Sequence, residues 1–214
     1  MGGATLYYVH DPMCAWCWGF RPVWQDLQQR LRTHLPDAVD VVTRVGGLAP
    51  DSDQPMPPAL REYVQRVWRQ VAATVPGTRF NADFWRQCEP RRSTYPACRA
   101  VLAVRRLDRR LEDAMVSAIQ RAYYLEAGNP ADAAVLIACA VSVGLDAQVF
   151  ERVFNDPARH ADLASELRCV RSLGVMGFPG LVVRTPGGLV PVAPHYTDAQ
   201  AMFMRIQAAV VKTP

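Results

Sequence analysis

Two cysteines separated by two residues are the part of this sequence whose types and spacing point most directly to chemistry. Cys14 and Cys17 lie in HDPMCAWCWGF, between a short apolar run and a long amphipathic pattern. A thiol at the first turn of a helix faces unpaired backbone N–H groups, which favour its thiolate. In such pairs the pKa of the first thiol falls from about 8.5 to about 3.5–7.5. Cys14 is therefore predicted to be a nucleophile, and Cys17 to resolve the mixed disulfide that Cys14 forms.

Two other interpretations of this pair are open. A zinc site would need a second cysteine pair or a histidine pair at ligand spacing, and the sequence has neither, so no metal is expected. The other alternative is two buried structural cysteines at the start of a helix. The remaining cysteines are isolated from one another and are expected to pack as small hydrophobic residues, with no role assigned: Cys88, Cys98, Cys139 and Cys169.

Composition and charge narrow the class of protein. The 214 residues carry 24 Lys and Arg against 20 Asp and Glu, and every cation except Lys212 is an arginine. The arginines are scattered along polar faces of predicted helices instead of forming a basic stripe, so no nucleic-acid partner is expected. No run approaches the ~18 apolar residues of a membrane span, and the first residues do not read as a signal peptide. We expect a cytoplasmic protein without membrane contact, of undetermined oligomeric state.

The amino-terminal pattern predicts a strand, a helix and a second strand. Residues 5–10 form a β-rich run that Asp11-Pro12 ends, and apolar residues at helical spacing follow from Phe20 to Leu35. A valine-rich strand over residues 39–45 then leads to Gly46-Gly47. This order is typical of two parallel strands with a covering helix.

The middle of the chain is helical in pattern, and strands return only near the end. Helices are predicted over residues 60–75, 84–85, 93–104, 111–127, 131–143, 146–154 and 158–173. Two strands, residues 180–185 and 189–193, are joined by a Pro-Gly-Gly turn, and a last helix covers residues 198–211. The predicted class is therefore α/β, with a helical block inserted between two parts of a sheet domain.

This element order, with the segment Gly177-Phe178-Pro179 near the end, is more specific than the cysteine pair alone. The chain resembles the thioredoxin superfamily, and its helical insertion makes it similar to the DsbA-like branch. Four segments resemble the cytoplasmic disulfide oxidoreductases and isomerases of that branch: YVHDPMCAWCWGF, GGLAPDSDQPMP, PRRSTYPACRA and GVMGFPG. The resemblance implies a thioredoxin-like domain of residues 1–50 and 156–214, interrupted by an all-helical domain of residues 55–155.

The resemblance also assigns roles near the thiols. Cys14 matches the nucleophilic cysteine and Cys17 the resolving cysteine. Pro179 matches the cis-proline that places main chain beside the sulfurs and offers an edge to an extended substrate. Phe178 would then face the dithiol and shape the substrate surface, with core packing as the alternative. An X-Pro bond is cis in only about 5% of cases, so the cis expectation comes from the resemblance.

Other residues are expected around this site. Ser93 and Thr94 match the part of the helical domain that faces the thiols in relatives, where they would bind substrate or hydrogen-bond near the sulfurs. The alternative is that they cap the helix that contains Pro96. Trp16 is interpreted as exposed substrate surface, and Trp18 as a packing residue.

Four positions depart from the family pattern or leave two interpretations open. Tyr8 stands where many relatives carry a buried acid that takes the proton of the resolving thiol. Asp11 is a substitute proton acceptor or, as we favour, the opener of a turn. His10 is a strand-end residue or a group that tunes Cys14. Gly180 replaces the threonine that often follows the cis-proline.

The function implied is a thiol–disulfide oxidoreductase or isomerase that acts on protein or small-molecule thiols and disulfides. The reaction requires no cofactor besides the dithiol, and glutathione is a candidate co-substrate. In a reducing cytoplasm, reductase or isomerase activity is the more natural expectation. One alternative is a glutathione-dependent transferase or isomerase on the same scaffold, in which relatives have serine at the position of Cys14. The other is a peptide-binding chaperone module whose redox chemistry is secondary.

Overall fold

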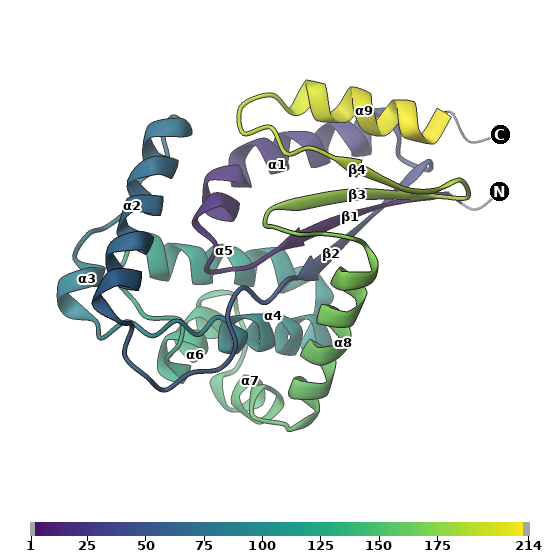
Figure 1. Cartoon of the computed structure of the whole chain (residues 1–214). Coiled ribbons are helices and arrows are strands. Elements are labelled where there is room, and N and C mark those ends of the chain that lie inside the picture. Colours follow the sequence, from purple (N-terminus) through teal and green to yellow (C-terminus); the bar gives the residue numbers. More distant parts are fainter. Residues whose placement is uncertain (1–2, 212–214) are drawn as a thin grey trace.

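The computed structural model describes residues 3–211 and places helices on both faces of a four-stranded sheet (Figure 1). The strand order is β2-β1-β3-β4, with β1 parallel to β2 and antiparallel to β3. The strands are β1 (Ala4–His10), β2 (Val39–Val45), β3 (Gly180–Thr185) and β4 (Gly188–Val192). Because β1 is flanked by strands on both sides, its carboxyl end lies at the middle of the sheet edge, directly before Cys14.

One face of the sheet is covered by α1 (Ala15–His34) and α9 (Ala199–Val211) (Figure 1). The apolar stripe that predicted the first helix is the face that α1 buries, and it packs against α9 and the sheet. Full burial of each large apolar side chain in this stripe contributes about 1.5–3 kcal/mol. The residues of α1 that form this face are Phe20, Val23, Trp24, Leu27 and Leu31.

The other face of the sheet meets α8 and the remaining helices. The helix α8 (Ala158–Ser172) contacts β2, and its end packs with Tyr7 and Val9 of β1. The remaining helices have a core of their own, centred on Trp68 and a cluster of aromatic rings. They are α2 (Pro58–Thr74), α3 (Phe84–Gln87), α4 (Tyr95–Leu107), α5 (Glu112–Tyr124), α6 (Ala133–Ser142) and α7 (Ala147–Phe154), with a 3-10 turn, Arg109–Leu111, before α5.

Met13 and Ala15, on either side of Cys14, belong to the core of these helices and not to the core under α1. The turn before α1 is therefore held between the sheet and the helical block. This position fixes the first cysteine at a junction of two packed units.

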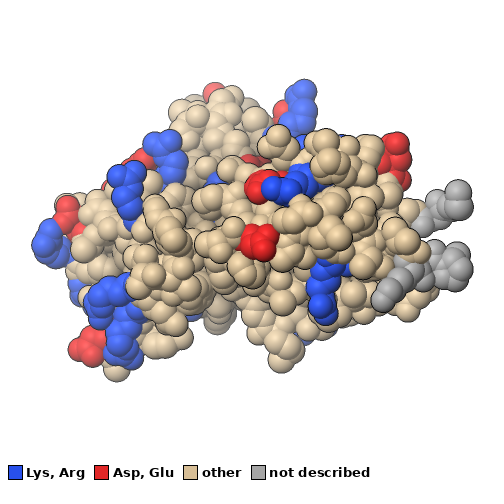
Figure 2. Space-filling model, turned by 90° about the horizontal axis from the view of Figure 1, so that it is seen from above, with Lys and Arg blue, Asp and Glu red and all other residues tan. Residues whose placement is uncertain are grey.

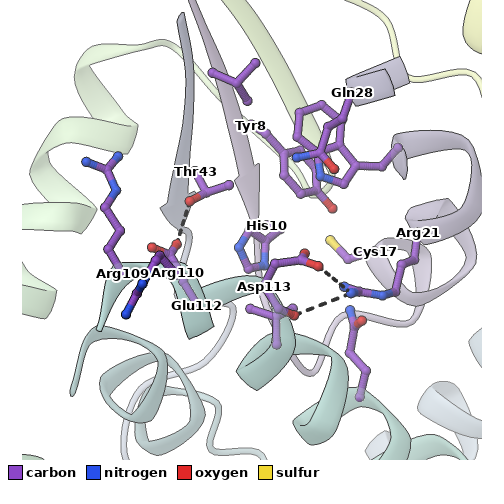
Figure 3. A pocket seen from close by; sticks show the side chains of 14 residues that line it. Tyr8, His10, Cys17, Arg21, Gln28, Thr43, Arg109, Arg110, Glu112 and Asp113 are labelled. Atoms are coloured by element: carbon purple, nitrogen blue, oxygen red, sulfur yellow. Dashed lines mark hydrogen bonds and ion pairs between the residues drawn. The ribbon is translucent and has the colours of Figure 1, made fainter. Parts of the chain in front are cut away.

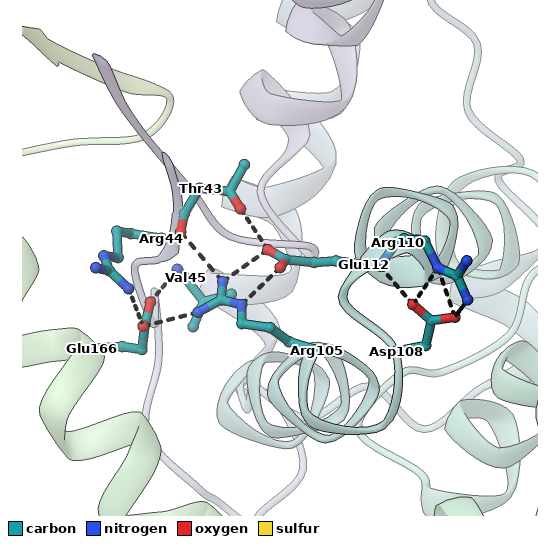
Figure 4. A network of polar contacts seen from close by, with 8 residues as sticks. All are labelled: Thr43, Arg44, Val45, Arg105, Asp108, Arg110, Glu112 and Glu166. Carbon is teal, nitrogen blue, oxygen red and sulfur yellow. Dashed lines mark hydrogen bonds and ion pairs between the residues drawn. The ribbon is translucent and has the colours of Figure 1, made fainter. Parts of the chain in front are cut away.

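A buried polar network also joins the helical block to the sheet (Figure 4). Arg105 of α4 binds Glu112 of α5 at 2.7 and 2.8 Å and Glu166 of α8 at 2.9 Å. Thr43 and Arg44 of β2 bind the same two carboxylates, at 2.5 and 2.8 Å. Three helices and one strand are thus linked through one arginine.

The predicted α/β class and element order are confirmed, while some helix boundaries differ from the prediction. The helix predicted over residues 111–127 begins as a 3-10 turn, and its α-helical part ends at Tyr124. Ala127 has a left-handed φ of 56°, so the chain reverses before the glycine that the sequence suggested as terminator. The all-helical stretch from α2 to α7 has the extent of the predicted insertion. Its independence as a domain stays a prediction.

The distribution of charge on the surface and the apolar character of the helices bear on nucleic-acid and membrane partners. Figure 2 shows blue and red side chains interspersed on one face, with broad tan areas between them. That face lacks the continuous basic stripe that binds a phosphate backbone. Within residues 3–211, no helix combines the length and apolar character needed to cross a bilayer.

Candidate active site

Cys14 is the N-cap residue of α1. Its backbone is extended, with φ −86° and ψ 118°, and its carbonyl accepts the N–H of Trp18 at 3.0 Å. The Cys14 N–H donates to the carbonyl of Asp11, also at 3.0 Å, which closes the turn after β1. The sulfur therefore lies in front of the amino terminus of a 20-residue helix, where unpaired N–H groups and the helix dipole favour an anion.

Cys17 follows one helical turn later, and the environments of the two thiols differ. Cys14 is 6% exposed, whereas Cys17 is completely buried, and both are free thiols. The hydrogen bond from the Cys17 thiol lowers the pKa of Cys14, against the opposing effect of burial. Burial raises the pKa of Cys17 well above its usual value, and the bond to Cys14 adds to that effect. The arrangement favours a thiolate at Cys14 and a thiol at Cys17.

The loop before β3 lies against Cys14. The Phe178–Pro179 peptide bond is cis, and the Cys14 thiol donates to the carbonyl of Phe178 at 3.6 Å. The Phe178 ring turns away and packs on Gly46 and on the cluster around Val170 and Leu173. The main chain of Phe178 therefore faces Cys14, as expected from the resemblance. Its ring instead packs against the core, which was the alternative interpretation.

Two glycines permit this placement of the loop. A Cβ on Gly46 would overlap the Phe178 ring. A Cβ on Gly180 would come within 2.5 Å of Cγ1 of Val175 and 3.2 Å of the carbonyl of Gly177. The glycine that replaces the family's threonine is thus explained by the close approach of Val175.

Asp11 opens the turn, as favoured from the sequence, and its carboxylate does more. One carboxylate oxygen accepts the N–H of Met13 at 2.8 Å. The other accepts the N–H of Leu48 at 2.6 Å, the hydroxyl of Thr94 at 2.7 Å and the thiol of Cys98 at 3.6 Å. Asp11 is completely buried, and burial raises the pKa of its carboxyl despite these bonds. It ties the active-site turn to α4.

Ser93 and Thr94 are buried and bind other parts of the protein. The Ser93 hydroxyl accepts the N–H of Ser52 at 3.2 Å. The Thr94 hydroxyl accepts the N–H of Ala49 at 3.0 Å and donates to Asp11. Thr94 is the N-cap residue of α4, as the capping alternative predicted, although its side chain makes no capping hydrogen bond. Thr94 supports the turn before Cys14, whereas substrate contact by either residue stays a prediction.

The two tryptophans of the motif are partly buried. Trp18 stacks on Tyr124 with ring centroids 5.7 Å apart, and its indole N–H donates to the carbonyl of Arg79 at 3.1 Å, which confirms its packing role. Trp16 lies 5.1 Å from the ring of Tyr196. Its surface is therefore less open than expected, and its contact with substrate stays a prediction.

Behind Cys17 lies a polar cavity of about 170 Å³ that sequence reasoning missed (Figure 3). His10 forms part of its wall and stacks on Tyr8 with ring centroids 5.1 Å apart. Burial lowers the pKa of His10 to about 4, so its imidazole is neutral at neutral pH. Burial also raises the pKa of Tyr8 well above its usual value. His10 is thus an interior residue that lines the same cavity as the resolving thiol.

The remaining cysteines lie outside the pair. Cys98 and Cys139 are buried as expected, and Cys88 and Cys169 are half-buried. Across the described part of the chain, residues 3–211, no group of three or more His, Cys, Asp or Glu side chains is placed to hold a metal ion.

Comparison with known proteins gives relatives over almost the whole chain. Residues 5–204 match the family model of the DSBA-like thioredoxin domain. A candidate protein disulfide isomerase from Nitrosomonas europaea has a similar structure, with a TM-score of 0.83, 27% identity and full coverage of both chains. The cytosolic disulfide reductase DsbM from Pseudomonas aeruginosa superposes with a TM-score of 0.74 at 28% identity, covering 97% of this chain and 98% of that one.

Two further relatives add detail. DsbM with GSH superposes with a TM-score of 0.73 at 27% identity, covering 97% of this chain and 98% of that one. The ClpXP adapter protein SpxH of Halalkalibacterium halodurans is 22% identical over 183 residues, which are 83% of this chain and 57% of that protein. This chain thus spans little more than half of that relative. The family match over residues 5–204 shows that the chain belongs to the DSBA-like thioredoxin domain family.

Proposed function

We propose that this protein is a thiol–disulfide oxidoreductase in which Cys14 is the nucleophile and Cys17 the resolving residue. The observation that carries this proposal is the asymmetry of the pair. Cys14 is at the start of α1 with its pKa lowered, and Cys17 is fully buried one turn later with its pKa raised. Membership of the DSBA-like family and the two disulfide-exchanging neighbours support the same activity.

The reaction proceeds in two exchanges. The Cys14 thiolate attacks one sulfur of a substrate disulfide, a Cys14–substrate disulfide forms, and the other substrate sulfur leaves as a thiolate that takes a proton. The Cys17 sulfur then loses its proton and attacks Cys14, which forms the Cys14–Cys17 disulfide and releases the second substrate thiolate. Two electrons pass from the dithiol to the substrate, and a thiol such as glutathione restores the dithiol.

We infer the reductive direction from the similar structures, among which are a cytosolic disulfide reductase and the same reductase with GSH. A strongly stabilised thiolate would make a dithiol oxidising, because it stabilises the reduced form. Hydrogen bonds lower the pKa of Cys14, while burial and the charge of Asp11 limit that fall. A reductase or isomerase in the cytoplasm, with glutathione as co-substrate, is therefore the activity that we propose.

The substrate surface is proposed to surround the Cys14 sulfur. Pro179 would present the start of β3 to an extended substrate, with Phe178 and Trp16 beside it. Thr94 is proposed to act indirectly, because it is buried and holds the turn that carries Cys14. Ser93 is also buried and binds Ser52, and we propose that it supports the same region from there. The substrates would be protein or small-molecule disulfides.

Reduction of insulin and of a glutathionylated peptide, coupled to glutathione and glutathione reductase, tests this proposal. Wild-type protein should be active, Cys14→Ala inactive, and Cys17→Ala should accumulate a mixed disulfide at Cys14. Cys88→Ala is the matched control and should keep full activity. Activity that persists without Cys14 would refute the proposal, and activity retained by Cys14→Ser would favour a glutathione-dependent transferase instead.

A further inference from the structure

The resolving residue Cys17 forms part of the wall of the polar cavity (Figure 3). Cys17 and Arg21 of α1, His10 of β1, and Asp113 of α5 are among its lining residues. Cys17 is completely buried, and the carboxylate of Asp11 also acts on its pKa. Asp11 already accepts four hydrogen bonds and is not among the residues that line this cavity, whereas His10 and Asp113 line it together with Cys17 (Figure 3).

The cavity contains buried polar atoms whose hydrogen bonds are incomplete. Within the described part of the chain, Nδ1 of His10 and Oε1 of Gln120 have no hydrogen-bond partner, although both residues are only 2% exposed. Leaving such an atom unpaired is destabilising, and a bound water relieves this cost. A polar cavity of about 170 Å³ has room for several water molecules. Water is therefore the expected link between these atoms and Cys17.

The second exchange requires a place for the Cys17 proton. Burial strongly disfavours a free thiolate at Cys17, so proton loss must accompany the attack on Cys14. The phenol of Tyr8 is a weak proton acceptor, because burial raises its pKa and so keeps the phenol protonated. Glu112 is bound by Arg105 and Thr43, and Asp113 pairs with Arg21 at 2.8 Å. These partners compete for the carboxylate lone pairs.

His10 is the basic group in this cavity with an unused acceptor atom, since Oε1 of Gln120, which is also unpaired, belongs to an amide that does not take up a proton at neutral pH. Burial lowers the pKa of His10 and so keeps its imidazole neutral. The positive charges of Arg105 and Arg21 act in the same direction, whereas the negative charges of Glu112 and Asp113 oppose it. With its proton on Nε2, the neutral ring presents a lone pair at the unpaired Nδ1. A neutral imidazole is also the commonest general base among side chains.

We propose that His10, acting through water in this cavity, accepts the proton of Cys17 during its attack on the Cys14 mixed disulfide. The inference rests on the proposed function. The S–H bond of Cys17 and the Cys14–substrate disulfide break, the Cys14–Cys17 disulfide forms, and the substrate sulfur leaves with the electron pair. The proton on His10 then returns through water toward the Arg21–Asp113 pair, whose aspartate side chain is 61% exposed, and so reaches solvent.

Stopped-flow reaction of the reduced protein with excess DTNB separates the two exchanges. The first thionitrobenzoate reports Cys14 attack and depends on reagent concentration, whereas the second reports Cys17 attack and does not. In His10→Gln the first phase should be unchanged and the second slowed by about tenfold or more. The solvent isotope effect on the second phase should also disappear. Added imidazole should restore that phase in His10→Ala.

Several results would overturn this role. A second phase unchanged in His10→Gln, or slowed with its isotope effect intact, would mean that His10 does not handle the proton. A wild-type second phase without a solvent isotope effect would refute the role even if the variants fail to fold. Loss of the first phase in the wild-type protein would instead count against the proposed function, so the two failures are distinguishable.

Discussion

At the residue scale, the buried carboxylate of Asp11 acts on both thiols of the pair. It holds the turn before α1 through four hydrogen bonds, and its charge raises the pKa of Cys14 and of Cys17. From the sequence, Asp11 was interpreted as a turn opener, with a proton acceptor as the alternative. Its bonds to Thr94 and Cys98 join positions more than 80 residues apart, and local sequence patterns carry no information about such pairs.

Replacement of Asp11 by asparagine should make the protein less reducing. Loss of the negative charge favours the Cys14 thiolate, so the pKa of Cys14 should fall and the potential of the pair should rise. A tenfold change in the exchange equilibrium corresponds to about 30 mV, which is the shift expected. A glutathione titration read by mass spectrometry measures it, with Asp132→Asn, at the partly buried ion pair with Arg91, as control. A potential that stays the same or becomes lower would contradict this effect.

The buried, neutral His10 should make stability depend on pH. Its pKa is about 4 in the folded protein against 6.5 for the free side chain, so the unfolded chain binds more protons between these values. The stabilisation is complete above pH 6.5 and is lost as pH falls toward 4, by roughly 3 kcal/mol.

Urea unfolding of wild type and His10→Gln at pH 7, 5.5 and 4 checks this, with His160→Gln as the control at an exposed histidine. The wild type and the control should lose this stability with falling pH, and His10→Gln should not. An identical pH dependence in all three proteins would contradict the assignment.

At the element scale, the loop before β3 is placed by packing on its far side. The ring of Phe178 occupies the space beside Gly46 at the end of β2, and this contact holds the carbonyl that faces Cys14. The strand and helix order was predictable because periodicity and turn residues are local signals. The position of the Phe178 ring was not predictable, because it depends on how two segments distant in sequence pack together.

Gly46→Ala should displace this loop. The added methyl group would overlap the Phe178 ring, and overpacking of this kind costs about 1–3 kcal/mol. We expect a loss of stability in that range and slower attack by Cys14, measured by urea unfolding and by the first DTNB phase. Gly187→Ala, in the open β3–β4 hairpin, should leave both unchanged. An unaltered first phase in Gly46→Ala would show that the loop position does not matter for the nucleophile.

At the scale of the whole molecule, the network around Arg105 holds the helical block against the sheet (Figure 4). From the sequence, the arginines were interpreted as solvated residues on polar helix faces. Arg105 instead lies among β2, α5 and α8, and the side chains of Glu112 and Glu166 are about nine-tenths buried. A charge on a predicted helix does not reveal that a second and a third element cover it, so this interface could not be predicted.

Arg105→Met should therefore destabilise the whole fold. It leaves two buried carboxylates without their shared partner, which costs about 3 kcal/mol. Arg121→Met removes the exposed pair with Glu126 and should cost less than about 1 kcal/mol. Urea unfolding curves compare the two variants. Equal effects would show that the network contributes no more than a surface ion pair.

The central claim is that Cys14 is the nucleophile and Cys17 the resolving residue. Titration of the reduced protein tests this claim most directly. The pKa of Cys14 is read from thiolate absorbance in wild type and Cys17→Ala, and disulfide formation is followed in a glutathione series. We predict a Cys14 pKa below that of a free cysteine and a two-electron equilibrium that ends in a Cys14–Cys17 disulfide. A Cys14 pKa near about 8.5 and no bond between these cysteines would contradict the account.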